Sequence, residues 1–133
     1  MKKINITSEF VLFGIVSDKN NYALVSQINA KLGFNFSQKE NIKIIEKNIE
    51  KQFPVFEYID ECDKLKYRFI NNRCENGFLI SKLKEINFLI QITENVSDNF
   101  KQEFIKKLKN IDGILLVSQI DKKYYEKIKN LYY

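Results

Sequence analysis

The chain has 133 residues, a formal net charge of +5 and no histidine. The absence of histidine excludes Ser-His-Asp and Cys-His catalysis, histidine-containing zinc sites and a histidine-based pH switch. The length predicts a single domain spanning residues 1–133. With 44% hydrophobic residues, a chain of this size can form a core without disulfides or metals.

Lysine supplies nearly all of the positive charge, since 20 of the 22 basic residues are lysine and two are arginine. The chain is also rich in isoleucine and asparagine and poor in alanine, which is the usage that A/T-rich codons produce. A protein selected to bind phosphate is expected to keep arginine, because its guanidinium binds phosphate through paired hydrogen bonds. We therefore interpret the basicity as genomic composition more than as a sign of a polyanion partner.

The N-terminal part predicts a buried strand followed by a helix. Residues 10–16 are rich in β-branched and aromatic residues, which favour a strand. Asn20 or Asn21 suits a helix N-cap, and Gly33 lies where that helix would end. The apolar residues between them form one helical stripe: Leu24, Val25, Ile28 and Leu32.

Residues 37–53 fit two structures. Ser37 and Glu40 have the spacing of a helix capping box, and the isoleucines at 42, 45 and 49 recur at helical spacing. Ile42 and Ile44 also alternate as in a strand, and the single proline, Pro54, is typical of an edge strand. We favour the strand.

The middle of the chain predicts antiparallel strands. Residues 53–59 and 65–70 form an expected hairpin, because the second run alternates apolar residues with Lys66 and Arg68. Residues 71–77 are rich in turn formers and end in Asn-Gly, the strongest short turn signal. Residues 86–92 then resume the alternation of a strand.

The C-terminal part predicts a helix, a strand and a second helix. Ser97 is the expected N-cap of the first helix, and Gly113 is expected to stop it. Its apolar face consists of Phe100, Phe104, Ile105, Leu108 and Ile111. Residues 114–120 are uncharged and begin with an uninterrupted apolar run, and we place this strand at the centre of the sheet. The terminal helix would have one apolar and aromatic side: Tyr124, Tyr125, Ile128, Leu131 and Tyr132.

This order of elements predicts an α+β fold. Hairpins in the middle of the chain and helices near both ends indicate an antiparallel or mixed sheet. We expect about five to six strands, with two to three helices packed on one face.

No motif in the sequence carries catalytic or cofactor chemistry. The four glycines are isolated, which excludes the phosphate-binding and dinucleotide-binding loops. Cys62 and Cys74 lack the spacing of zinc or redox motifs. The acidic residues at 57, 60, 61 and 63 lack the spacing of a calcium loop, and we interpret them as a solvated hairpin tip. We predict no catalytic residue, no cofactor and no metal.

The sequence also lacks a segment that would span a bilayer. The longest apolar run near the N-terminus covers about eight residues, whereas a spanning helix needs roughly 18 to 20. No small-residue cleavage site follows that run. We expect a cytoplasmic protein without a membrane partner.

The C-terminal segment carries the basic surface that we single out as a candidate interaction site. Its members are lysines and tyrosines of the expected last helix: Lys122, Lys123, Lys127, Lys129, Tyr132 and Tyr133. A basic helix edge with aromatic residues suits binding to RNA or to a groove on a partner protein. The alternative, which we favour, is a tyrosine-rich helix packed on the sheet with its lysines in water.

Blocks of sequence along nearly the whole chain suggest a family. Ile80 and Ile86 have the spacing of a motif within residues 77–88, and further blocks lie at 13–15, 32–33, 53–58, 72–77 and 113–115. On these blocks the chain resembles a divergent member of the IPExxxVDY family of Bacteroidota, named for Ile-Pro-Glu, three variable residues and Val-Asp-Tyr. Four of the motif's polar or aromatic positions are replaced: Ser81, Lys82, Asn87 and Phe88. The resemblance implies a small cytoplasmic α+β protein and transfers no activity or site residue.

We therefore predict a non-enzymatic interaction domain with an unidentified protein partner, which includes a second copy of the chain in a homodimer. The alternative is an RNA- or ribosome-associated protein that uses the basic, tyrosine-rich C-terminal helix. Both predicted functions follow from a sequence that has enough apolar residues for a core and no group of residues that suits catalysis.

Overall fold

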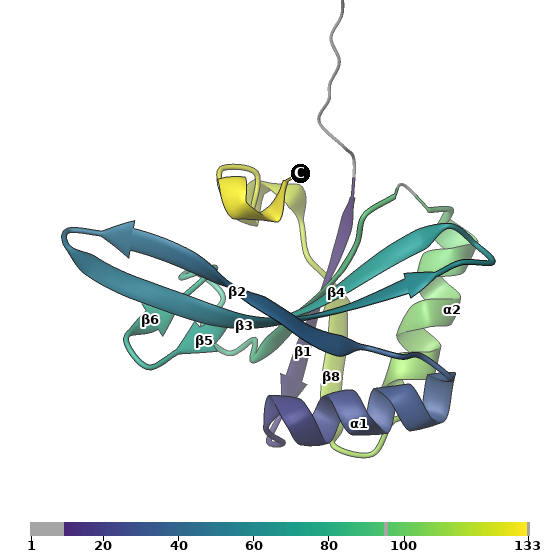
Figure 1. Cartoon of the computed structure of the whole chain (residues 1–133). Helices are drawn as coiled ribbons and strands as arrows, with labels where there is room; N and C mark the ends of the chain where they lie inside the picture. Colours follow the sequence, from purple (N-terminus) through teal and green to yellow (C-terminus); the bar gives the residue numbers. More distant parts are fainter. Residues whose placement is uncertain (1–9, 95, 133) are drawn as a thin grey trace, which may run out of the picture.

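The structure is a computed structural model and describes residues 10–94 and 96–132. Its centre is a six-stranded sheet in the order β2-β3-β4-β7-β1-β8, in which all neighbours are antiparallel (Figure 1). The strands are β1 (Val11–Ser17), β2 (Ser37–Glu46), β3 (Ile49–Asp60), β4 (Leu65–Asn71), β7 (Phe88–Ile92) and β8 (Ile114–Gln119). A small separate hairpin consists of β5 (Arg73–Cys74) and β6 (Gly77–Phe78). The α-helices are α1 (Asn21–Leu32) and α2 (Asp98–Lys109).

The expected α+β fold with an antiparallel sheet is thus confirmed. The expected strand and helix at the N-terminus are also confirmed, with Asn20 as the N-cap of α1 and Gly33 in a left-handed conformation at its C-terminal end. Ser97 is the N-cap of α2, as predicted. These elements follow from signals that lie within a few residues of one another, namely an apolar period and its caps.

The ambiguous segment is a strand, as favoured. β2 and β3 are joined by Lys47 and Asn48, which both have positive φ, so the hairpin has the tight two-residue turn that matches strand twist. The competing capping box at Ser37 and Glu40 is not formed, because both residues lie in the strand β2. The hairpin of β3 and β4 is confirmed as well, with Tyr58 opposite Tyr67.

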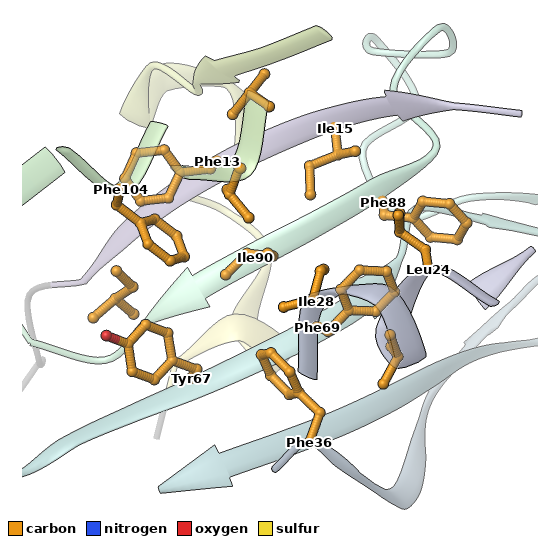
Figure 2. Close-up of a cluster of buried hydrophobic side chains, with 14 of the residues drawn as sticks. Phe13, Ile15, Leu24, Ile28, Phe36, Tyr67, Phe69, Phe88, Ile90 and Phe104 are labelled. Atoms are coloured by element: carbon orange, nitrogen blue, oxygen red, sulfur yellow. The ribbon is translucent and has the colours of Figure 1, made fainter. Parts of the chain in front are cut away.

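Both α-helices cover one face of the sheet (Figure 1). Alternate residues of the central strands point to this face and pack against buried side chains of α1 and α2, such as Leu24, Ile28 and Phe104 (Figure 2). Phe13 of β1 lies edge-on to Phe104 of α2, with ring centroids 5.3 Å apart. This first cluster buries the helices' apolar stripes and is the larger source of hydrophobic stability.

The opposite face is covered by the C-terminal segment and by the loop between β6 and β7. Leu12, Ile70 and Leu89 point to this face from the sheet. The loop contributes Ile80 and Ile86, and the C-terminal segment contributes Tyr125 and Leu131, all of which are buried. The sheet is therefore buried on both faces, which explains why β1 and β7 carry almost no exposed side chains.

The strand expected at the centre of the sheet is instead at its edge. β8 pairs with β1, whereas the central positions belong to β4, β7 and β1. An uninterrupted apolar run shows that a strand is hydrophobic on both sides, but it does not specify how many neighbours the strand has. In β8 the apolar character is partly exposed, at Leu115 and Leu116.

The expected terminal α-helix is also wrong. The segment forms two short 3₁₀ turns, η1 (Lys122–Tyr124) and η2 (Lys129–Leu131), joined by extended backbone at Ile128. Tyr125, Ile128 and Leu131 follow one another at intervals of three and all pack against the sheet. That interval matches the three residues per turn of a 3₁₀-helix, so side-chain burial favours the tighter turns.

Two boundaries also differ from expectation. α2 ends at Lys109 with Asn110 as its C-cap, and Gly113 has φ +95° in the turn that leads into β8. Ile111, between these two positions, is buried against the first cluster and helps to set where the chain turns. β7 begins at Phe88, because residues 79–87 form the loop on the second face.

Candidate functional site

The C-terminal segment is held on the sheet by a buried chain of hydrogen bonds. Arg68 Nη1 donates to Gln91 Oε1 at 3.0 Å, and Gln91 Nε2 donates to the backbone oxygen of Leu131 at 2.6 Å. Both side chains are buried, and the Arg68 guanidinium lies 3.9 Å from Glu57. Buried amide and guanidinium groups need such partners, so this chain of bonds gives the segment a defined position.

The structure separates the residues predicted as one basic surface. Lys122 and Lys123 are exposed in η1, where the Lys123 Nζ atom lies 5.2 Å from the centre of the Tyr124 ring. Tyr132 is half-buried with its ring centroid 4.9 Å from that of Phe10, so it serves packing. Tyr133 lies outside the described residues. The favoured interpretation of packed tyrosines and solvated lysines fits Tyr125 and Tyr132, although not on an α-helix.

Lys127 and Lys129 lie together at a groove between the C-terminal segment and the β2–β3 hairpin. The groove has a volume of about 340 Å³ and is lined by both apolar and charged residues. Its principal lining residues are Ile44, Phe78, Leu79, Ile128, Glu46, Lys51, Lys127 and Lys129. Lys51 Nζ lies 3.0 Å from Glu46 Oε1, so one of the three lysines is already paired. The sequence offers no signal for Lys51 or Phe78, because only the fold brings them here.

The free edge of β8 is a second candidate surface. Leu115 and Leu116 are 65% and 55% exposed there. Val16 opposes Leu116 and Ser17 opposes Ile114, so Leu115 is an extra residue without a partner on β1. Backbone groups alternate in direction along an antiparallel strand. Half of the N–H and C=O groups of β8 therefore point away from β1, towards the open side of the sheet.

The two edges of the sheet differ in charge. β2, at the other edge, carries Lys39, Glu40, Lys43 and Glu46. β8 has the sequence ILLVSQ and carries no charge. Both edges have a register shift, so a bulge does not distinguish them. Charged side chains are a common protection of sheet edges against pairing with other chains, and β8 lacks them.

A cavity of about 580 Å³ lies at the end of β1 beside the β5–β6 hairpin. Its charged residues are of both signs: Asp18, Lys19, Arg73 and Glu75. Cys74 is half-buried at its wall, and its Sγ atom lies 3.2 Å from Asn76 Oδ1. The balanced charges favour neither an anion nor a cation, and the residues provide no nucleophile paired with a base.

The acidic residues around the β3–β4 turn stabilise the turn. Asp60 Oδ1 accepts hydrogen bonds from the backbone N–H groups of Cys62 and Asp63. Glu57 lies 3.5 Å from Lys66 on the neighbouring strand. Throughout residues 10–94 and 96–132, no three His, Cys, Asp or Glu residues are arranged to hold a metal ion.

Neither of the described α-helices has the length and apolar character needed to cross a membrane. No protein-family model and no curated protein matches the sequence.

Proposed function

We propose that this protein is a non-enzymatic interaction domain that binds another polypeptide as an added strand at β8. The observation that carries the proposal is the uncharged, solvent-facing edge of β8 with two exposed leucines. In strand addition, main-chain hydrogen bonds provide affinity and alternating side chains provide specificity.

The composition of β8 supports this function over a purely structural role. A free edge that serves only to end a sheet is typically protected by charges, as β2 is. Leucine side chains at 65% and 55% exposure leave apolar area in water. Covering it stabilises a complex by roughly 25 cal/mol per Å², before the cost of association.

A capture experiment with matched variants tests this proposal. Leu116→Lys places a charge on the β8 edge, and Ile45→Lys makes the same kind of change at a side chain that is 69% exposed on β2. Immobilised wild-type protein and the Ile45→Lys variant should retain the same proteins from a native lysate, and Leu116→Lys should lose them. Identical retention by all three chains would refute binding at β8.

A second candidate function, association with RNA or a ribosome, is supported by the groove at η2. Lys127 and Lys129 line the same groove as Phe78, which is half-buried. Lysines neutralise phosphates, and an aromatic ring stacks with an unpaired base, so this combination suits a single-stranded nucleotide.

The RNA function has its own charge-matched test. Lys127→Glu/Lys129→Glu reverses two charges at the groove, and Lys106→Glu/Lys107→Glu does the same on the exposed face of α2. We expect affinity for single-stranded RNA to fall for the groove variant, with a salt dependence smaller by about two units of slope. Equal losses in both variants would show that only net charge matters.

We also propose, from the sequence resemblance, that the chain is a divergent cytoplasmic member of the IPExxxVDY family. Ile80, which the motif shares, and Ile86, which stands where the motif has Val, support this, because they are 2% and 6% exposed and pack in the second cluster. The replaced Ser81 and Lys82 are exposed. The structure of a member with the intact motif should show the motif's Ile and Val buried at the same place, and a different chain path there would contradict membership.

A further inference from the structure

We propose that the strand added to β8 is β8 of a second copy, paired antiparallel across a two-fold axis near Leu116 and Val117. This inference rests on the proposed function and names its partner. A two-fold axis perpendicular to a sheet makes two edge strands antiparallel, which is the arrangement that all the pairs of this sheet already have.

The absence of charge on β8 makes it a better contact between two copies than the charged edge at β2. Each chain carries a net charge of +5, so two copies repel one another at long range. The strand ILLVSQ brings no charge to the contact. In any register centred on residues 116 and 117, the opposing side chains are isoleucine, leucine, valine, serine or glutamine, and none of these pairs is repulsive.

The flanks of β8 are complementary in the same orientation. Asp112 is exposed just before the strand, and Asp121, Lys122 and Lys123 are exposed just after it, so that positive charge is in excess on the second flank. Antiparallel pairing lays the beginning of one strand beside the end of the other. Asp112 of each copy would therefore lie near the flank of the other copy in which the two lysines outweigh Asp121, and the two-fold axis would form this contact twice. This gives Lys122 and Lys123 a role in recognition apart from the groove lysines.

Symmetry also doubles the apolar surface that the contact would bury. Leu115 and Leu116 of both copies, now 65% and 55% exposed, would be covered together. The outward backbone groups of one strand would satisfy those of the other, as in any ladder of the sheet. A single isologous contact thus removes the unprotected edge from both molecules.

Sedimentation equilibrium over a roughly hundredfold range of protein concentration tests the inference. Wild-type protein and Ile45→Lys should show a monomer–dimer equilibrium. Leu116→Lys and, separately, Leu115→Lys should weaken it by about tenfold or more, because each dimer would bury two added charges. Both leucines are more than half exposed, so these variants should retain the wild-type circular dichroism and melting temperature. Raising the salt concentration should strengthen the dimer, since it screens the repulsion between two positively charged chains.

Disulfide cross-linking between engineered cysteines tests where the two copies meet. In a chain with Cys62→Ser and Cys74→Ser, Leu116→Cys lies near the proposed axis and should form disulfide-linked dimers on mild oxidation. Ile45→Cys, exposed on the other edge, should remain monomeric. Equal cross-linking at both positions would contradict a defined axis at β8.

The outcomes separate the two proposals. If wild-type protein is a monomer at all concentrations, or if its dimer is unaffected by both leucine variants, the second copy is not the partner. If Leu116→Lys nevertheless loses captured lysate proteins that Ile45→Lys keeps, binding at β8 stands with a different polypeptide. If the dimer forms at β8 and no other protein is captured, self-association accounts for the edge.

Discussion

At the residue scale, Asn72 is a fully buried polar side chain just after β4 that makes three hydrogen bonds. Its Oδ1 accepts a hydrogen bond from the N–H of Ile80 at 2.8 Å. Its Nδ2 donates to the backbone oxygens of Leu83 at 3.0 Å and Ile86 at 2.9 Å. One amide thereby joins three positions of the loop between β6 and β7, in addition to backbone bonds such as that from the N–H of Leu83 to the oxygen of Ile80.

Replacing Asn72 should destabilise the protein strongly. Asn72→Leu keeps the approximate volume but leaves one N–H and two C=O groups without their side-chain partner. We expect the free energy of unfolding to fall by about 2–4 kcal/mol. Chemical denaturation measures this, with Asn99→Ala on exposed α2 as a control that should change stability by less than about 0.5 kcal/mol. A small effect of Asn72→Leu would show that the loop is held by its isoleucines.

Because Tyr67 is buried as a neutral phenol, its ionisation should lower the free energy of unfolding at alkaline pH. Its side chain is 2% exposed, and burial, aided by the nearby negative charges of Asp60 and Asp63, raises its pKa. The fold therefore favours the neutral phenol, so this stabilisation is complete below the unfolded pKa of about 10 and is lost as pH rises further. Tyr67→Phe should lose less stability than wild type above about pH 10. Parallel melting-temperature profiles of the two chains in that range would contradict this account.

At the element scale, the C-terminal segment shows how burial sets the type of helix. Its buried residues recur every three positions, and its backbone forms short 3₁₀ turns rather than an α-helix. Backbone bonds within those turns include the N–H of Tyr125 to the oxygen of Lys122. The anchor of the segment is Gln91, which reaches it from the centre of the sheet.

Gln91→Leu should loosen this segment. The substitution leaves the oxygen of Leu131 without its donor and removes the acceptor of Arg68 Nη1. We expect a loss of about 2–4 kcal/mol in the free energy of unfolding and faster hydrogen exchange at residues 122–132. Gln102→Leu on the exposed face of α2 is the matched control. Unchanged exchange in the segment would show that Tyr125 and Leu131 hold it by packing alone.

At the scale of the whole molecule, one sheet is shared by two apolar clusters. The first lies under α1 and α2, and the second lies under the C-terminal segment and the loop after β6. Each cover protects a different face of the same central strands, so neither cluster is independent of the other. This coupling explains why β1 and β7 are buried on both sides.

Truncation after Ile120 should therefore damage the whole fold. It removes Tyr125 and Leu131, both buried, and exposes the apolar face formed by Leu12, Ile70 and Leu89. We expect a loss of at least about 3 kcal/mol in the free energy of unfolding, together with binding of a hydrophobic dye. Differential scanning calorimetry and dye fluorescence measure both effects. A wild-type melting temperature in the truncated chain would contradict the shared core.

Elements with complete local signals were predictable from the sequence. α1 has an apolar stripe between Asn20 and Gly33, and the β3–β4 hairpin has a polar tip followed by an alternating strand. The β2–β3 hairpin was harder, because Lys47 and Asn48 form its turn without the glycine that usually marks one. The candidate site was only partly predictable. Lys127 and Lys129 belong to a groove, but Lys51 and Phe78 join them from distant parts of the chain.

The amino-acid sequence alone was sufficient for the fold class, the strands and helices with strong periodicity, and the absence of histidine chemistry. These properties depend on composition and on neighbours a few residues away. The edge position of β8 and the path of the C-terminal segment were decided by tertiary structure. A strand's hydrophobicity is the same wherever it pairs, and a tyrosine- and lysine-rich segment can bury its apolar residues on more than one helical period. Packing against β1 and the second face of the sheet selected one arrangement, and it left Leu115 and Leu116 exposed.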